Sequence, residues 1–397
     1  MTKKSDAPAI RFKGFSDAWE QRKVSDLAEK TYGGGTPTTS NEAYWNGDIP
    51  WIQSSDVVDG KLLGVEPRKW ITQDGLNNSA AQLIPGNSIA IITRVGVGKL
   101  AFMPYSYATS QDFLSLSKLN AEPLFTVYAC YKKLQSELNA VQGTSIKGIT
   151  KDELLAKNIM VPRYAEQQQI GAFFKQLDNL ITLHQRKFEK LTNVKKSMLE
   201  KMFPQNGSSY PEIRFKGFTD PWEQRKFEEI AVRSSVICSD DTLPRVEYED
   251  IVSGTGRLNK DIYAKQSIKS GIAFHQGDVL YGKLRPYLQN WLLPTFDGLA
   301  VGDFWVLQPQ NADSSFLYRL IQSRQFDEVA NQSTGTKMPR ADWKLVSKTV
   351  FSIPSNISEQ AAIGTYFTAL DSLITLHQRE LEKLQNIKKS MLEKMFV

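Results

Sequence analysis

The amino-acid sequence predicts an α+β protein with two mixed α/β domains, separated by two long helices that pair as an antiparallel coiled coil. Three observations support this fold class. A long helical segment occurs twice, a short segment that precedes each mixed domain also occurs twice, and the residues between them differ between the two halves. The chain therefore carries an internal repeat, and we expect its halves to be related by a pseudo-two-fold axis.

The long repeat covers residues 170–203 and 363–396, at a constant offset of 193 residues, and 25 of its 34 positions are identical. Neither copy contains proline, and the only glycine of each copy is its second residue. Apolar residues recur at alternating spacings of three and four, which is the pattern of a coiled-coil seam. A continuous helix of this length extends about 50 Å, at about 1.5 Å per residue.

Two near-identical apolar stripes in one chain favour packing of the two helices on each other. The alternative is that each helix packs only on its neighbouring domain. Identity extends to positions outside the seam, in LITLHQR and KKSMLEKMF, so we expect one protein partner to bind twice. A histidine stands at the same seam position of both copies, and a single polar seam residue often sets register or orientation. The predicted seam and partner-docking residues are Leu177, Ile181, His184, Leu191 and Met198, with Leu370, Ile374, His377, Leu384 and Met391.

The composition is that of an ordinary folded protein long enough for two or three domains, with 397 residues, 41% hydrophobic and 23% charged. A formal net charge of +6 is compatible with nucleic acid binding without requiring it. The two cysteines, Cys130 and Cys238, are far apart, which favours reduced thiols in a cytoplasmic protein. We expect no membrane span, because no apolar run reaches 18 residues, and the N-terminus lacks the apolar core of a signal peptide.

The short repeat opens each half of the chain. IRFKGFSDAWEQRKVSDLAE at residues 10–29 returns as IRFKGFTDPWEQRKFEEIAV at residues 213–232, an offset of 203. Since the long repeats are offset by 193, the second intervening segment is ten residues shorter than the first. A segment rich in Pro, Gly and Ser, residues 204–212, is a plausible linker between the halves. If the helices run antiparallel, the two intervening segments lie at opposite ends of the rod.

The intervening segments have similar predicted elements. In the first, residues 47–58, 86–103 and 112–119 are expected to form strands, and residues 122–138 an amphipathic helix. In the second, residues 277–288 and 303–310 are expected to form strands, and residues 314–333 one helix. Each segment then passes a Gly-Thr pair and a short apolar strand that ends in proline before the long helix begins. The repeated segments are nearly the same in both halves, so we expect them to perform one function twice. The intervening segments differ, so we expect them to perform two variants of a second function.

Sequence motifs argue against catalysis by this chain. Only three histidines are present, too few to build a zinc site easily, and two of them are the equivalent seam residues. TRVGVGKL lacks the first Gly and the final Ser or Thr of a phosphate-binding P-loop, which favours a strand and turn. Neither a Glu-x-Lys pair of the usual magnesium nucleases nor a Pro-Pro-aromatic motif of adenine methyltransferases occurs.

The loops of the two inserts are better candidates, for binding DNA. Ser, Thr and Gln side chains can bond base edges and phosphates, glycine amides can approach a phosphate, and Arg offers a bidentate fork to guanine. The alternative for each loop is a plain surface loop. Lys283, Arg285 and Tyr287 are expected to alternate along a strand. The complete set of candidates is Gly34, Gly35, Thr36, Ser54, Ser55, Arg94, Lys99, Gln111 and Lys147 in the first half, and Lys283, Arg285, Tyr287, Lys337 and Arg340 in the second.

Taken together, the motifs resemble those of the specificity (S) subunits of type I restriction-modification systems, over nearly the whole chain. The resemblance depends on IRFKGFxDxWEQRK, GGGTPTTSNEAYWNGDIPW, GDVLYGKLRPYL, FDGLAVGDF and the IGxxFxxLDxLITLHQR helix. It implies two target recognition domains that each bind one half of a bipartite DNA site. It also implies that the paired helices set the gap between the half-sites and dock two modification (M) subunits.

The family further implies that S-adenosylmethionine is bound by the M subunits, and that two restriction (R) subunits use ATP and magnesium. No cofactor or metal is expected in this chain, which is expected to be non-catalytic by itself. The predicted boundaries are 1–165 for the first repeat and recognition domain, 166–203 for the central helix and 204–212 for the linker. Residues 213–357 form the second repeat and recognition domain, and residues 358–397 the C-terminal helix. The competing hypothesis is an interaction scaffold that does not bind DNA.

Overall fold

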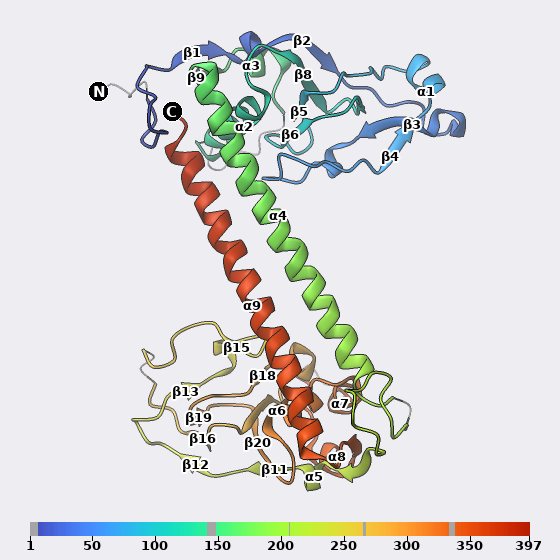
Figure 1. Cartoon of the computed structure of the whole chain (residues 1–397), viewed down its shortest axis with the longest axis vertical. Coiled ribbons are helices and arrows are strands. Elements are labelled where there is room, and N and C mark those ends of the chain that lie inside the picture. Colours follow the sequence, from blue (N-terminus) through green and yellow to red (C-terminus); the bar gives the residue numbers. More distant parts are fainter. Residues whose placement is uncertain (1–6, 141–147, 206, 265–266, 333–337) are drawn as a thin grey trace. The chain divides into compact units, whose positions relative to one another are not determined.

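A computed structural model describes residues 7–140, 148–205, 207–264, 267–332 and 338–397 of the chain (Figure 1). It divides into two compact units, each described here by itself. Unit 1 comprises Met1–Gln185 with Arg379–Val397, and unit 2 comprises Arg186–Gln378. The structure and the sequence repeats therefore divide the chain differently, because each long helix contributes one part to each unit.

The two long helices are α4 (Tyr164–Lys201) and α9 (Ile357–Lys394), each an uninterrupted helix of 38 residues. Both begin six residues before the repeated segment, shortly after Pro162 and Pro354, and both end two residues before its last position. The prediction of two long helices is confirmed. Their start fits the absence of a backbone donor on proline and the extended conformation that proline favours in the residue before it.

Seam residues of α4 and α9 meet in both units, which confirms the predicted pairing. In unit 1, Leu177 lies in a core against which Leu384 and Met391 pack, so the first part of α4 meets the last part of α9. In unit 2, Leu370 lies in a core against which Leu191 and Met198 pack. The helices therefore run antiparallel within each unit. The remaining seam residues, Ile181, His184, Ile374 and His377, are half-buried.

The short repeat forms the same structure in both units. β1 (Glu20–Lys23) pairs antiparallel with β9 (Asn158–Val161), and β10 (Glu223–Lys226) pairs with β21 (Val350–Ile353) in the equivalent register. Arg11 makes two hydrogen bonds to Glu166, of 2.7 and 2.8 Å, and Arg214 makes the same two bonds to Glu359. Both carboxylates are almost fully buried at the start of a long helix, where a bidentate guanidinium is the partner that compensates for lost water.

Helix ends close the two cores. Phe396, just past α9, packs against Trp19 and Phe125 in unit 1. Phe203, just past α4, packs against Trp222 and Phe316 in unit 2. Since these tryptophans belong to the short repeat, each unit combines one short repeat with the start of one long helix and the end of the other.

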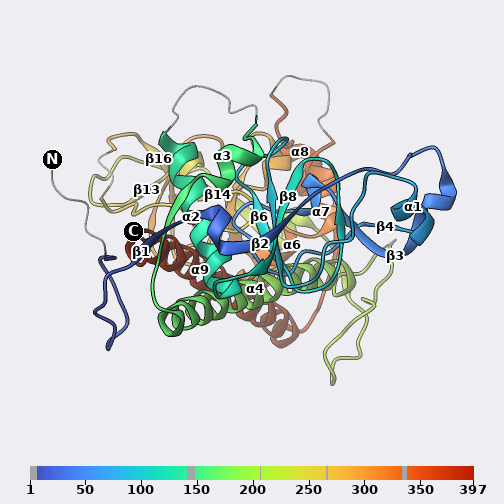
Figure 2. The same cartoon turned by 90° about the horizontal axis from the view of Figure 1, so that it is seen from above.

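Besides the β1–β9 ladder, the described part of unit 1 holds two sheets, shown from above in Figure 2. The first has the order β2-β8-β5-β6 and packs on α2, and the second has the order β4-β3-β7 and lies with the short helix α1 on the side away from α2 (Figures 1 and 2). The bounds are β2 (Ala28–Gly33), β3 (Trp45–Ile52), β4 (Lys69–Ile71), α1 (Gln73–Asn77), β5 (Ser88–Ile92), β6 (Leu100–Met103), β7 (Ala108–Thr109), β8 (Phe113–Leu119), α2 (Pro123–Ala140) and α3 (Lys151–Leu155).

Unit 2 repeats this plan with different sequence. Its first sheet has the order β11-β20-β17-β18 and its second the order β12-β16-β19-β13. The strands are β11 (Ala231–Ser234), β12 (Ile237–Cys238), β13 (Arg245–Val246), β14 (Ile251–Val252), β15 (Arg257–Leu258), β16 (Gly271–Phe274), β17 (Val279–Gly282), β18 (Trp291–Leu292), β19 (Gly298–Ala300) and β20 (Phe304–Pro309). The helices are α5 (Phe227–Ile230), α6 (Ser314–Leu320), α7 (Arg324–Ala330) and α8 (Trp343–Lys348).

Two predicted elements of unit 2 were wrong in extent. The strand expected over residues 277–288 ends at Gly282, because Arg285 has a positive φ of 49° and Pro286 starts a short 3-10 helix. Lys283, Arg285 and Tyr287 therefore do not alternate along a strand. The single helix expected over residues 314–333 is two helices, because Ser323 accepts a hydrogen bond from the Phe326 amide and caps a new helix.

Candidate nucleic-acid interface

Several of the candidate residues lie where three segments of each unit meet. In unit 1, the end of the β5 hairpin is held by the turn before β8 and by the segment before α3. The Thr93 amide donates to the Asp112 carbonyl, and the Ile149 amide donates to the Thr93 carbonyl, each at 2.8 Å. These two bonds fix the base of a loop that carries Arg94.

Unit 2 makes the corresponding pair of bonds. The Lys283 amide donates to the Asp303 carbonyl at 2.9 Å, and the Ala341 amide donates to the Lys283 carbonyl at 2.8 Å. Asp303 precedes β20 as Asp112 precedes β8, and Ala341 precedes α8 as Ile149 precedes α3. The two units thus bring equivalent segments together although their sequences differ, and candidates from both halves lie on these segments.

In unit 1 the three segments and the end of β2 line a cavity of about 780 Å³. Gly34, Arg94 and Gln111 are predicted residues on its wall, and Thr36 reaches it through a 2.7 Å hydrogen bond from its hydroxyl to the Gln111 side chain. Arg94 and Gln111 are exposed. A guanidinium, an amide and hydroxyls around one opening offer donors and acceptors that could bond base edges or phosphates.

Close packing of the backbone explains why glycine occupies positions 34 and 35. A Cβ on Gly34 would lie 1.8 Å from the Ser110 carbonyl oxygen, and a Cβ on Gly35 would lie 2.2 Å from the backbone of Ala80. The Gly35 amide already donates to the Thr109 carbonyl at 2.8 Å. Close backbone packing therefore explains both residues, and the Gly35 amide is not available to a phosphate in this conformation.

Three further predicted residues of unit 1 lie off the cavity wall. Lys99 is half-buried and belongs to the same β5–β6 hairpin as Arg94, with its amide bonded to the Gly96 carbonyl. Ser54 and Ser55 lie in the 3-10 turn after β3, where the Gln53 side chain bonds the Ser55 hydroxyl at 3.0 Å. A DNA role for these three stays a prediction.

In unit 2 the structure brings Lys283 and Arg340 to one carboxylate. Asp303 is 3.5 Å from the Lys283 ammonium and 3.1 Å from the Arg340 guanidinium. Burial acts to raise the pKa of Asp303, but the hydrogen bond from Arg340 and the charges of Arg340 and Lys283 hold it below its usual value. Two cations share one anion here, so this surface keeps a positive charge that favours phosphate.

Arg285 lies between these groups in the chain and is anchored by its backbone. Its amide donates to the Pro339 carbonyl at 2.7 Å, and the neighbouring Leu284 carbonyl accepts from the Tyr248 hydroxyl. Its Nε is buried without a hydrogen-bond partner among the described residues. Tyr287 is 57% exposed in the following 3-10 turn. A positive φ outside glycine is uncommon and often marks a functional loop.

Two candidates, Lys147 and Lys337, lie outside the described residues, as do the Gly-Thr pairs near them. Conversely, the cavity wall includes Thr93, Thr150 and Lys151, which sequence reasoning did not select. Thr150 caps α3 by accepting from the Glu153 amide, and a Thr-x-x-Glu capping box was visible in the sequence. Recognising the start of that helix would have marked the segment as a turn next to the Gly-Thr pair.

The long helices carry matching exposed leucines. Leu180 and Leu183 of α4 are 43% and 46% exposed, and Leu373 and Leu376, at the equivalent positions of α9, are 44% and 52% exposed. A shallow groove of about 520 Å³ on α9 is lined by polar residues and by Ile387 and Met391, and its polar residues include Arg379, whose repeat equivalent on α4 is Arg186. The outer faces thus present the same apolar and polar groups twice.

Within the described residues, no helix is both long and apolar enough to cross a membrane. No cluster of three or more His, Cys, Asp or Glu side chains suited to a metal ion occurs in that part of the chain.

The chain is similar to proteins of one family. The family model "Type I restriction modification DNA specificity domain" matches residues 16–193 and 221–386. The Type I restriction enzyme MjaIX specificity subunit of Methanocaldococcus jannaschii is 22% identical over 407 residues, covering 95% of this chain and 92% of the relative. The EcoR124I/EcoR124II specificity subunit of Escherichia coli is 31% identical over 159 residues, covering 38% of this chain and 39% of the relative.

Among solved structures, the S subunit of a type I restriction-modification system from M. genitalium superposes with a TM-score of 0.67 at 15% identity. That match covers 98% of this chain and 99% of the other. A likeness at this identity shows that the fold is shared.

Proposed function

We infer, from the premise that this chain belongs to the family of type I restriction modification DNA specificity domains, that it is the DNA-recognition subunit of such a complex. Each unit binds one half of a bipartite DNA site, and because the two inserts differ, the half-sites differ. The observation that carries this proposal is the equivalent meeting of three segments in both units, with exposed basic and polar side chains on them. These segments would face DNA.

Phosphate contacts from exposed basic side chains supply affinity, while base contacts supply discrimination. In unit 1, Arg94 and Gln111 are the side chains best placed for base edges, since they are exposed beside the cavity. In unit 2, Lys283 and Arg340 supply charge, and Arg285 has a buried Nε without a partner among the described residues. DNA would neutralise the positive charge left at Asp303.

The long helices dock two M subunits, and the exposed leucine pairs are the residues that support this proposal. Apolar side chains repeated at equivalent exposed positions suit one partner bound twice. S-adenosylmethionine is bound by the M subunits, and two R subunits join with ATP and magnesium. This chain supplies recognition and no catalytic step. The competing hypothesis, a scaffold without DNA contact, gives the basic loops of both units no role.

A reconstitution experiment tests the proposed function. We expect this chain with its M subunits to methylate adenine in a split DNA sequence, and neither component to do so alone. Binding should weaken steeply between low and high salt, because phosphate contacts release counterions. Labelled S-adenosylmethionine gives the methylation readout, and an electrophoretic shift gives the binding readout. A complex that binds its M subunits but shifts no duplex at any salt concentration supports the scaffold.

The same preparation tests the docking proposal. Leu376→Arg places a charge in one exposed leucine pair, and we expect it to remove one M subunit and to leave the other, as measured by the mass of the complex. Leu183→Arg is expected to do the same through α4, and the double variant to remove both. If the double variant keeps two M subunits, the leucine pairs are not the docking sites.

Arg285→Ala is expected to weaken or relax recognition of one half-site by about 1–3 kcal/mol, if its guanidinium makes a bidentate base contact. The measurement is methylation of duplexes that vary one base pair at a time in each half-site. Arg324→Ala is the matched control, because Arg324 is an exposed arginine of the same unit that forms a surface pair with Glu328. Equal discrimination by the wild type and Arg285→Ala at every position removes Arg285 from the interface.

A further inference from the structure

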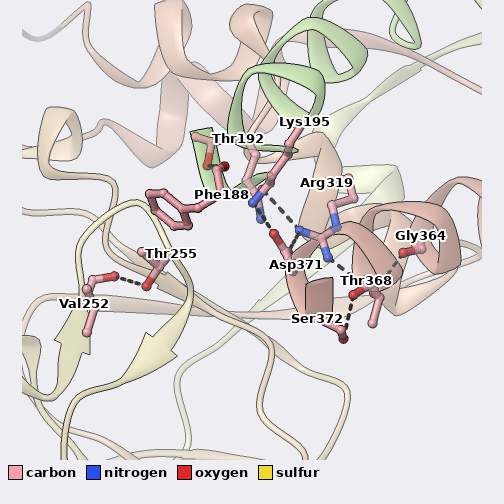
Figure 3. A network of polar contacts seen from close by, with 11 residues as sticks. Phe188, Thr192, Lys195, Val252, Thr255, Arg319, Gly364, Thr368, Asp371 and Ser372 are labelled. Carbon is pink, nitrogen blue, oxygen red and sulfur yellow. Dashed lines mark hydrogen bonds and ion pairs between the residues drawn. The ribbon is translucent and has the colours of Figure 1, made fainter. Parts of the chain in front are cut away.

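A polar network in unit 2 joins both long helices to the recognition domain (Figure 3). Asp371 on α9 accepts from the Lys195 ammonium of α4 at 2.6 Å and from the Arg319 guanidinium of α6 at 2.7 Å. Arg319 also donates to the Thr368 hydroxyl at 3.3 Å. Three elements that are separate in sequence therefore share one carboxylate.

Unit 1 contains the counterpart, built from the equivalent helix residues. Asp178 on α4 accepts from the Lys388 ammonium of α9 at 2.6 Å and from the Tyr128 hydroxyl of α2 at 2.6 Å. Lys388 also donates to the Gly60 carbonyl at 2.9 Å. In both units, one carboxylate oxygen accepts from the lysine of the opposite long helix. The other oxygen accepts from a side chain of the recognition domain.

The residues of the long repeat are identical in both networks, whereas their partner from the recognition domain is not. Asp178 and Asp371 are equivalent, as are Lys195 and Lys388, but the third member is Tyr128 in one unit and Arg319 in the other. Tyr128 and Arg319 occupy the same place, the sixth residue of α2 and of α6. Equivalent aspartates of the repeated helices therefore bind a different side chain of the recognition domain in each unit.

Burial makes this geometry demanding. Arg319 is 2% exposed, and the side chains of Lys388 and Asp178 are 11% and 13% exposed. A buried charge that loses its partner is strongly disfavoured, so the domain helix cannot slide or rotate without breaking the network. Buried polar pairs of this kind can fix register at a helix interface.

We propose that Asp178 and Asp371 are positioning residues that hold each recognition domain on the helix pair in one orientation, and that they thereby set the half-site spacing the complex accepts. This inference depends on the proposed function, since spacing has meaning only for a bipartite site. On this proposal, the accepted half-site spacing depends on Asp178 and Asp371 as well as on the length of the helices.

The test uses the chain with its M subunits and duplexes whose half-sites are separated by the native gap, or by one base pair less or more. The readout is the ratio of methylation rates on native and altered gaps. Because a misplacement of about 1 Å can cost on the order of 100-fold in rate, we expect Asp371→Asn and Asp178→Asn each to lower this ratio about tenfold. Loss of stability alone lowers every rate and leaves the ratio unchanged.

Tyr128→Phe provides a milder variant, since it removes one hydroxyl and keeps the Lys388–Asp178 pair. We expect it to lower the ratio in the same direction. Glu328→Gln is the control, because it neutralises an exposed carboxylate of α7 that pairs with the exposed Arg324, away from the network.

Exchanging the charges separates the two networks. Asp178→Lys with Lys388→Asp is expected to restore the ratio in part, because the Tyr128 hydroxyl can accept from a lysine as well as donate, whereas the Gly60 carbonyl loses its donor. Asp371→Lys with Lys195→Asp is expected not to restore the ratio. The Arg319 guanidinium can only donate hydrogen bonds, and it would face a second positive charge at residue 371. If the wild type discriminates between gaps and both Asn variants and Tyr128→Phe discriminate equally well, the inference is overturned. A wild type that ignores the gap contradicts the proposed function instead.

Discussion

Replacing Phe396 by Ala is expected to lower the free energy of unfolding of unit 1 by about 3–5 kcal/mol, the usual cost of emptying an aromatic site in a core. The Phe396 ring stacks on Phe125 at 5.6 Å and lies 5.7 Å from Phe174 and 6.4 Å from Trp19. These neighbours belong to α2, α4 and the short repeat, so one ring fills the space where three separate segments meet. The cavity left by alanine cannot close without moving all three.

Urea or thermal unfolding, followed by tryptophan fluorescence, measures this loss. Val397→Ala is the matched control, because Val397 is the next residue and is 37% exposed. Phe203→Ala is expected to destabilise unit 2 by a similar amount, since Phe203 stacks on Phe316 at 5.7 Å in the equivalent position. A loss below about 1 kcal/mol, within the range of an ordinary substitution, contradicts the view that the helix ends close the cores.

Exchanging residues 227–349 for the corresponding segment of a relative is expected to change recognition of one half-site and to leave the other unchanged. Its junctions lie at the ends of the β10–β21 ladder, so the strands that hold the insert are retained. The Arg214–Glu359 pair and Trp222 are also outside the exchanged segment. The loop with Lys283 and Arg285 and the segment with Arg340 are replaced together.

Discrimination between specific and non-specific DNA is typically about 10³–10⁷-fold, so the old half-site should lose all measurable preference. Mapping of methyladenine across a genome, in cells that carry the exchanged gene, reads both half-sites at once. The reciprocal exchange of residues 24–157, between β1 and β9, should change only the other half-site. If either exchange altered both half-sites, independent recognition by the two units would be wrong.

The duplicated segments account for most of what could be predicted. Identity over 25 of 34 positions and a 3-4 spacing of mostly apolar residues are enough to indicate α4 and α9, because a helix seam is a local pattern. Arg11 and Arg214 were visible as repeated residues, but their partners Glu166 and Glu359 are 155 and 145 residues away. A contact over that distance depends on the fold, and no local pattern encodes it.

The candidate interface was predicted only in part. Arg94, Gln111 and Gly34 share one cavity, and Lys283 and Arg340 share one carboxylate, whereas Ser54 and Ser55 lie elsewhere in unit 1. Arg285 was placed on a strand because its flanking residues alternate, and the structure puts it in a turn with positive φ. That conformation depends on long-range bonds to Pro339 and Tyr248.

The seam itself held a signal that sequence reasoning missed. Lys195 and Lys388 stand at seam positions between Leu191 and Met198 and between Leu384 and Met391, where an apolar residue is expected. A lysine present in both copies at such a position indicates a buried acid nearby, and Asp371 and Asp178 are those acids. Their further partners, Tyr128 and Arg319, come from the unrepeated segments, where no pattern marks them.

The sequence by itself determined the internal repeat, the two long helices, the family and the expectation of two unlike recognition domains. Repeats and periodicity can be recognised from the order of residues along the chain, without knowledge of the fold. Only the tertiary structure decided which loops share a cavity, which cations share Asp303, and which side chain of each domain reaches the helix carboxylates. Those contacts join residues tens to hundreds of positions apart, and strand pairing and core packing, rather than local preference, bring them together.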